Sequence, residues 1–142
     1  MSGKSDYLEG QFLAHIFRTA AFTKPTVIAV ALCTAAPSDA STGATIAEAA
    51  YTGYSRTALN PLDTNWAAPS AGNGQTSNSV AITIGSAPTS GPTVATHFAI
   101  LDSTTVGAGN VLYWAALTAS KTINSGDPAP YFPIGSLVVT EA

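Results

Sequence analysis

The sequence predicts a mainly β protein, an antiparallel β-sandwich of jelly-roll or immunoglobulin-like type with one amphipathic helix at its N-terminus. After Pro25, short apolar or alternating segments recur between turn-forming residues, and the chain contains 12 Gly and 9 Pro. No helical pattern alternates with these segments, which excludes a βαβ architecture. A length of 142 residues is typical of one domain. We therefore expect a single domain over residues 1–142, with a helix at about 6–22 and a sandwich at about 26–142.

The N-terminal segment has the apolar spacing of a helix. Asp6 and Glu9 form a variant of the capping box, with Asp6 as the expected N-cap, and Pro25 is expected to stop the helix. The stripe either covers the open end of the chain's own sandwich, which we favour, or docks on a neighbouring subunit. Its residues are the candidate docking face: Leu8, Phe12, Leu13, Ile16 and Phe17.

The strands are predicted from runs rich in β-branched residues or with alternating polarity. Turn-rich residues 103–110 are expected to close a hairpin. Residues 60–78 are expected to form a long loop with Trp66 as its anchor, and residues 119–133 a turn-rich connection. The expected strands are 26–33, 53–60, 79–85, 93–102, 111–117 and 134–141. Their large side chains predict the core between two sheets: Val80, Ile82, Ile84, Phe98, Ile100, Leu112, Trp114, Leu137 and Val139.

Charge is scarce in this chain. Charged residues make up 9% of it, against about 25% in an ordinary soluble domain. The net charge of −3 and only five basic residues argue against a nucleic-acid partner. A polar surface with so little charge suits burial against other subunits, so we expect an assembled protein that associates with itself or its neighbours.

The sequence predicts no membrane partner and no secretion signal. The first apolar run, residues 26–33, is too short to span a bilayer, and the N-terminus is polar and charged. Cys33 is the only cysteine, so an intrachain disulfide is impossible, and we expect it to be buried.

No arrangement of residues predicts catalysis, a metal site or a cofactor. His15 and His97 lie on different predicted elements, the carboxylates are isolated from one another, and the Gly-x-Ser-x-Gly nucleophile motif is absent. Several aromatic residues, Trp66 and Tyr131 among them, could stack on a sugar if they clustered, but core packing is the favoured interpretation. We predict that the chain is not an enzyme and binds no cofactor or metal.

Several phrases, in order along nearly the whole chain, carry a family resemblance: FLAHIFRTAAFTKP, VIAVALCTAAPSD, GYSRTAL, THFAILDS, GNVLYWAALTASKTINSGD and FPIGSLVVT. In these the chain resembles a family of small structural proteins from tailed bacteriophages, whose members are labelled tail-fibre or minor tail proteins. The resemblance implies a virion component with no enzymatic activity, and the polar, charged N-terminus without a secretion signal indicates synthesis in the host cytoplasm. It supplies no set of functional residues.

The chain lacks the heptads and repeats of a long fibre shaft. We expect a decoration or cement protein of the particle surface, docked on capsid subunits or on itself. A tail-fibre or minor tail protein at the base of an appendage is the first alternative, and a virion-borne module that binds a host surface glycan is the second.

Overall fold

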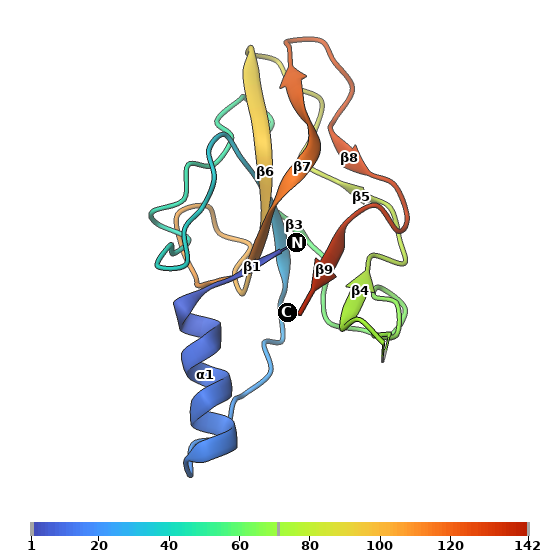
Figure 1. Cartoon of the computed structure of the whole chain (residues 1–142). Helices are drawn as coiled ribbons and strands as arrows, with labels where there is room; N and C mark the ends of the chain where they lie inside the picture. The colour runs from blue at the N-terminus through green and yellow to red at the C-terminus, as the bar shows by residue number, and fades with distance from the viewer. Residues whose placement is uncertain (1, 71, 142) are drawn as a thin grey trace.

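The centre of the fold is a five-stranded antiparallel sheet. The computed structural model describes residues 2–70 and 72–141. The strand order is β1-β7-β6-β2-β3, and the long β6–β7 hairpin forms the middle of the molecule (Figure 1). The strands are β1 (Gly3–Lys4), β2 (Ala29–Cys33), β3 (Thr57–Ala58), β6 (Thr93–Leu101) and β7 (Val111–Ile123).

Two short antiparallel ribbons lie against one face of this sheet. One pairs β4 (Gln75–Ser77) with β9 (Val138–Thr140), and the other pairs β5 (Ile82–Thr83) with β8 (Tyr131–Phe132). They take the place of a continuous second sheet and enclose the main core (Figure 1). The predicted class, mainly antiparallel β with one helix near the N-terminus, is confirmed.

Most of the predicted core is buried as expected. Seven of the nine residues belong to one buried cluster on the ribbon side of the sheet: Ile82, Ile84, Phe98, Ile100, Leu112, Leu137 and Val139. Val80 is exposed, because it precedes β5 and lies outside the paired part of the predicted strand. Trp114 packs instead against a second buried cluster, on the other face of the sheet, which includes Ala31, Cys33, Leu101 and Val111.

A β-bulge explains the position of Trp114. Ile100 pairs with Tyr113 while Leu101 pairs with Val111, so Leu112 is an extra residue on β7. An extra residue reverses the alternation of the side chains that follow it. Leu112 and Tyr113 consequently both face the main cluster, and Trp114 is turned to the opposite side, contrary to our prediction.

A buried ion pair holds the loops on that opposite side. Arg56 is 5% exposed, and its guanidinium donates to both carboxylate oxygens of Glu48, at 2.8 and 2.9 Å. It also donates to the carbonyls of Ser103 at 2.9 Å, Ala108 at 2.7 Å and Gly43 at 3.2 Å. The pair therefore joins the segment before β3 to the β6–β7 turn. Arg56 was predicted to lie in a strand, but it directly precedes β3, and its pairing with Glu48 was not predicted.

The helix α1 (Asp6–Phe17) begins at the predicted residue but ends sooner than predicted. Its N-cap is Ser5, not Asp6: the Ser5 hydroxyl accepts the backbone N–H of Leu8 at 3.2 Å and donates to the carbonyl of Val111. Because Ser5 is also fully buried against β7, this cap fixes the base of the helix to the sheet.

The helix ends at Phe17 rather than near residue 22, so Pro25 does not stop it. Arg18 is extended (φ −130°, ψ 179°), and the chain then turns back along the helix. The N–H of Phe22 donates to Nδ1 of His15 at 3.2 Å, and its ring lies 5.5 Å from that of Phe12. These contacts replace the hydrogen bonds of a further helical turn.

The strand limits also differ from those predicted. The predicted hairpin is confirmed, but β7 extends beyond residue 117 to Ile123. Strands β4 and β8 fall inside segments expected to be a loop and a turn-rich connection, and the short β1 was not predicted. The Ser2 hydroxyl donates to the carbonyl of Thr140 at 2.6 Å and accepts its N–H at 2.9 Å. These contacts join the two ends of the described chain. The single domain over residues 1–142 stays a prediction, and its end residues 1 and 142 lie outside the described part of the chain.

Candidate docking surface

Helix α1 projects from the body of the molecule and touches it mainly at its base (Figure 1). Of the predicted docking face, Leu8 is buried in the main core. Phe12 is half-buried against Phe22, and the Lys4 ammonium lies 5.5 Å from the centre of its ring. These two residues therefore serve the chain's own packing.

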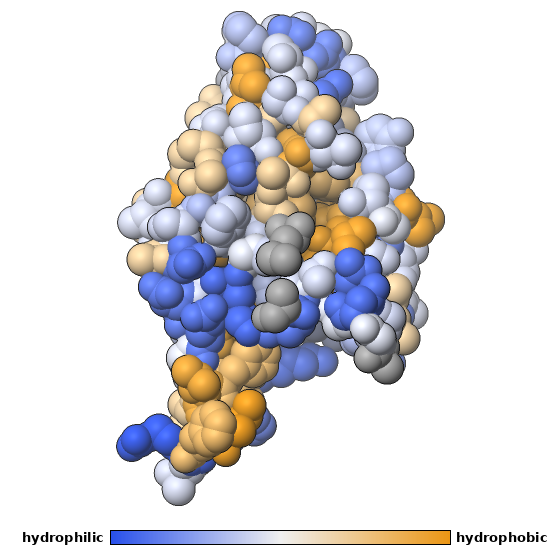
Figure 2. Space-filling view, viewed as in Figure 1, coloured by the Kyte–Doolittle hydropathy of each residue, from blue (hydrophilic) through white to orange (hydrophobic). Residues whose placement is uncertain are grey.

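The other three residues of the predicted face are exposed. Leu13 is 58% exposed, Ile16 66% and Phe17 77%. Apolar residues accordingly gather on the protruding helix, below a belt of hydrophilic residues (Figure 2). The expectation that the stripe covers the chain's own sandwich is wrong for these three residues. The structure divides the stripe into an inner part, Leu8 and Phe12, and an outer part, which we call the outer face: Leu13, Ile16 and Phe17.

A groove runs between α1 and the β4–β9 ribbon. Its volume is about 740 Å³. The helix contributes one wall and the ribbon with its preceding loop the other, and the lining is Lys4, Glu9, Phe12, Leu13, Ile16, Pro69, Gly74, Gln75, Thr76, Tyr113, Val139 and Glu141. Two residues of the outer face thus border a space large enough for side chains of another molecule.

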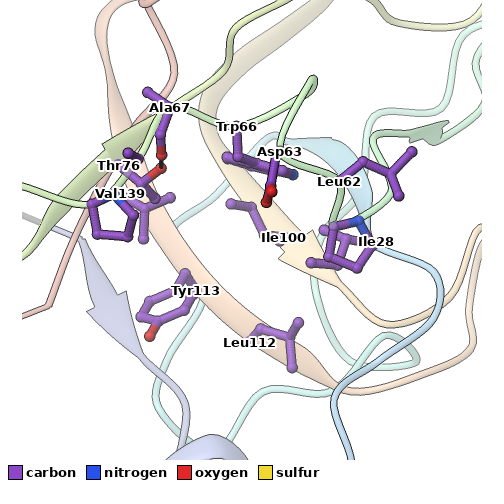
Figure 3. A pocket seen from close by; sticks show the side chains of 13 residues that line it. Ile28, Leu62, Asp63, Trp66, Ala67, Thr76, Ile100, Leu112, Tyr113 and Val139 are labelled. Carbon is purple, nitrogen blue, oxygen red and sulfur yellow. Dashed lines mark hydrogen bonds between the residues drawn. The ribbon is translucent and has the colours of Figure 1, made fainter.

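The groove adjoins an apolar hollow of about 580 Å³ beside it (Figure 3). The two share Pro69, Thr76, Tyr113 and Val139. Side chains of the sheet, Ile100, Leu112 and Tyr113, lie on one side of the hollow, and Leu62, Trp66 and Ala67 of the loop lie across from them (Figure 3). Carbon atoms dominate these walls, so the hollow suits apolar rather than charged groups.

The loop over this hollow is held by its own hydrogen bonds. Trp66 donates its indole N–H to the carbonyl of Leu59 at 3.1 Å, and Thr76 donates to the carbonyl of Ala67 at 2.7 Å. Since the polar atoms of Trp66 and Thr76 are already paired, these residues offer mainly shape and apolar surface to a partner.

An ionic contact lies at the inner end of the groove. Lys4 and Tyr113 both donate to the carboxylate of Glu141. Partial burial acts to raise the pKa of Glu141, but these two hydrogen bonds and the charge of Lys4 outweigh it and hold that pKa below its ordinary value. Burial, together with the hydrogen bond to Glu141, raises the pKa of Tyr113. This contact joins β1 to the end of β9 and so anchors the base of α1.

Titratable groups outside the groove take part in contacts within the fold. The ring of His15 accepts the N–H of Phe22, and the ring of His97 lies 2.8 Å from the hydroxyl of Thr96. Burial, followed by the charge of Glu48, raises the pKa of the Cys33 thiol to about 12. Within residues 2–70 and 72–141, no group of three or more His, Cys, Asp or Glu could hold a metal ion. Nor is any helix in these ranges long and apolar enough to cross a membrane.

A comparison with family models identifies the family. The model described as Gp80, podophage GP4 fiber I protein gp80, matches residues 3–140. The chain belongs to this family. No curated protein matches the chain. Membership in the Gp80 family confirms the predicted class, a family of structural proteins of tailed bacteriophages of the tail-fibre type.

The five residues of the helix stripe were predictable from the sequence, but their division into an inner and an outer part and the groove were not. One signal was available: Phe22 is a large apolar residue between the stripe and Pro25, and it could have been read as folding back on the helix. The groove depends on the β4–β9 ribbon, whose pairing joins residues more than 60 positions apart and leaves no local pattern.

Proposed function

We propose that this protein is a non-enzymatic structural subunit of a phage fibre, attached to a neighbouring virion subunit through the outer face of α1. The observation that carries the proposal is the exposure of Leu13, Ile16 and Phe17 on a helix whose base is anchored in the sheet. Apolar side chains exposed together on a small protein mark an interaction site. A fixed base would let the helix transmit force between the body and its partner.

The description of the matching family is that of a fibre protein. It therefore supports the fibre role over the shell decoration or cement role that we favoured from the sequence. The low charge of the surface fits both roles, because both bury surface against other subunits. The two roles differ in copy number: shell decoration requires hundreds of copies per particle, whereas a fibre requires a few dozen at most.

A glycan-binding role has less support. The expected sign was a cluster of exposed aromatic side chains near Trp66 or Tyr131. Trp66 lines the hollow of Figure 3, whereas Tyr131 lines a different one beside β7 and β8. The two residues therefore do not form a common stacking platform.

The test is incorporation into virions of a phage that carries the double variant Leu13→Ser, Phe17→Ser. We expect the variant protein to fold, with a melting temperature close to that of the unaltered chain, but to be missing from purified particles analysed by quantitative mass spectrometry. Ile134→Ser is the matched control, since Ile134 is 68% exposed and far from α1 in the sequence. Normal incorporation of the double variant would contradict the proposed attachment, and density for the protein on the head shell would contradict the fibre role.

A further inference from the structure

We propose that the outer face of α1 pairs with the same face of a second copy of this chain, with the two helices antiparallel and each bordering the groove of the other. The inference deepens the proposed function and rests on it, because it names the partner that the outer face takes.

The groove and the exposed side chains belong to the same helix, which favours a second copy as the occupant. An apolar helix that enters the groove meets Leu13 and Ile16 on its wall. If that helix is the α1 of another copy, it brings its own Leu13, Ile16 and Phe17, and one contact buries both sets. Such a contact is isologous, the usual form of a two-fold interface.

The charges along α1 select the antiparallel orientation. Asp6 and Glu9 lie in the first turn, while His15 is in the last turn and Arg18 follows it as the C-cap. Asp6, Glu9 and Arg18 are exposed, and the two ion pairs found among the described residues include none of them. Antiparallel helices place acidic ends beside basic ends, whereas parallel helices place like charges together.

The positions of the side chains fit a two-fold axis between Leu13 and Ala14. With that axis, Glu9 lies level with Arg18 of the second copy, and Gly10 lies level with its Phe17. The space around Gly10 is open, since a Cβ there would meet nothing within 4 Å. The most exposed ring of the helix would therefore lie over the residue that has no side chain. Gly10, Leu13 and Phe17 follow the i, i+3, i+7 spacing of a helix-pair seam.

The size of the contact predicts moderate affinity. A helix of 12 residues is about 18 Å long and about 10 Å wide, so the face that it presents is much smaller than the about 800 Å² per partner of a standard interface. The ribbon wall of the groove, which includes Pro69 and Val139, adds to the contact. We therefore expect a dimer that dissociates in the micromolar range.

The experiment is sedimentation equilibrium of the full chain, from about 1 to 200 µM, with circular dichroism to confirm folding of every variant. The unaltered chain is expected to form dimers. Phe17→Ser removes two buried rings from a two-fold interface and should raise the Kd at least about 100-fold, whereas Ile134→Ser should leave it unchanged. A chain that stays monomeric at 200 µM would overturn the proposal.

A charge exchange tests the orientation. The two-fold axis makes the contact between residues 9 and 18 occur at two equivalent places in the dimer. Glu9→Arg alone, or Arg18→Glu alone, therefore places like charges opposite each other at both places and should raise the Kd about 10-fold. The double variant restores opposite charges and should return the Kd to within about 3-fold of the original. No recovery in the double variant would overturn the antiparallel arrangement.

The two proposals fail differently. If the chain is monomeric while the variant Leu13→Ser, Phe17→Ser is lost from particles, the outer face binds another virion protein, and self-pairing is wrong while the proposed function stands. If the chain dimerises through α1 but the same variant enters particles normally, self-pairing stands and attachment through this face is wrong.

Discussion

Replacing Arg56 with Ala removes the side chain that joins three parts of the fold. Its guanidinium makes two hydrogen bonds to Glu48 and one each to the carbonyls of Ser103, Ala108 and Gly43. The Arg56 side chain is fully buried, and that of Glu48 is 8% exposed. The variant therefore leaves a buried carboxylate whose remaining side-chain partner is the hydroxyl of Tyr54 at 2.6 Å.

The expected loss of unfolding free energy is large. Removing one partner of a buried ion pair costs about 3–5 kcal/mol, because the other charge stays buried without compensation. The three carbonyls lose a donor as well, and each would cost about 1–3 kcal/mol if water could not reach it. These terms overlap, so we expect a total near 4 kcal/mol, with a fall in melting temperature of about 10–20 °C for a domain of this size.

Urea and thermal unfolding followed by circular dichroism measure this loss. Arg18→Ala is the matched control: it deletes the same side chain at an exposed position and should change stability by less than about 0.5 kcal/mol. The double variant Arg56→Met, Glu48→Leu removes both charges and should be more stable than Arg56→Ala. A loss below about 1 kcal/mol for Arg56→Ala would refute the reasoning.

Three further predictions concern the core, the thiol and the pH dependence of the terminal contact. Ile82→Ala should cost about 2–5 kcal/mol in urea unfolding and the exposed Val80→Ala less than about 0.5, and the reverse order would mean that the face of β5 is misassigned. Cys33 should resist alkylation by iodoacetamide at pH 8 until urea unfolds the chain, because burial and its pKa of about 12 keep it protonated; rapid labelling of folded protein would show that it is accessible. The lowered pKa of Glu141 means that its charged form contributes stability above its ordinary pKa, and this contribution is lost as the pH falls through the folded value. The difference in melting temperature between Glu141→Gln and the unaltered chain should therefore be largest near neutral pH and shrink as the pH falls below the ordinary pKa of a glutamate; a difference that does not change with pH would argue against this contact.

The parts of the fold that sequence predicted are those with local patterns. The hairpin of β6 and β7 was predictable because alternating residues flank a glycine-rich turn, and the burial of Ile82 and Ile84 followed from the same alternation. The pattern failed at Leu112, where a bulge changes the facing of every later residue, because no residue type announces a bulge.

The candidate site was predictable in composition but not in geometry. Helical spacing identified Leu8 to Phe17 as one apolar stripe. Which residues of the stripe face the chain's own core depends on Phe22 and on the sheet, and both reach the helix only through tertiary contacts. The buried pair of Arg56 and Glu48 escaped notice for the same reason, since nothing in a sequence says that charged residues eight positions apart will be enclosed together.

The anchoring of α1 has a consequence for the timing of synthesis. The cap residue Ser5 can form its hydrogen bond to the carbonyl of Val111 only after Val111 has been synthesised. The neighbouring Lys4 likewise needs Glu141, which lies almost at the other end of the chain. The ribosome adds residues at about 5–20 per second, so the helix is made several seconds before its base can be fixed. A chain that stops before β9 lacks Glu141 and the outer wall of the groove. Under the proposed attachment through α1, binding to a partner would then require nearly the whole chain, and prematurely ended subunits would stay out of the growing particle.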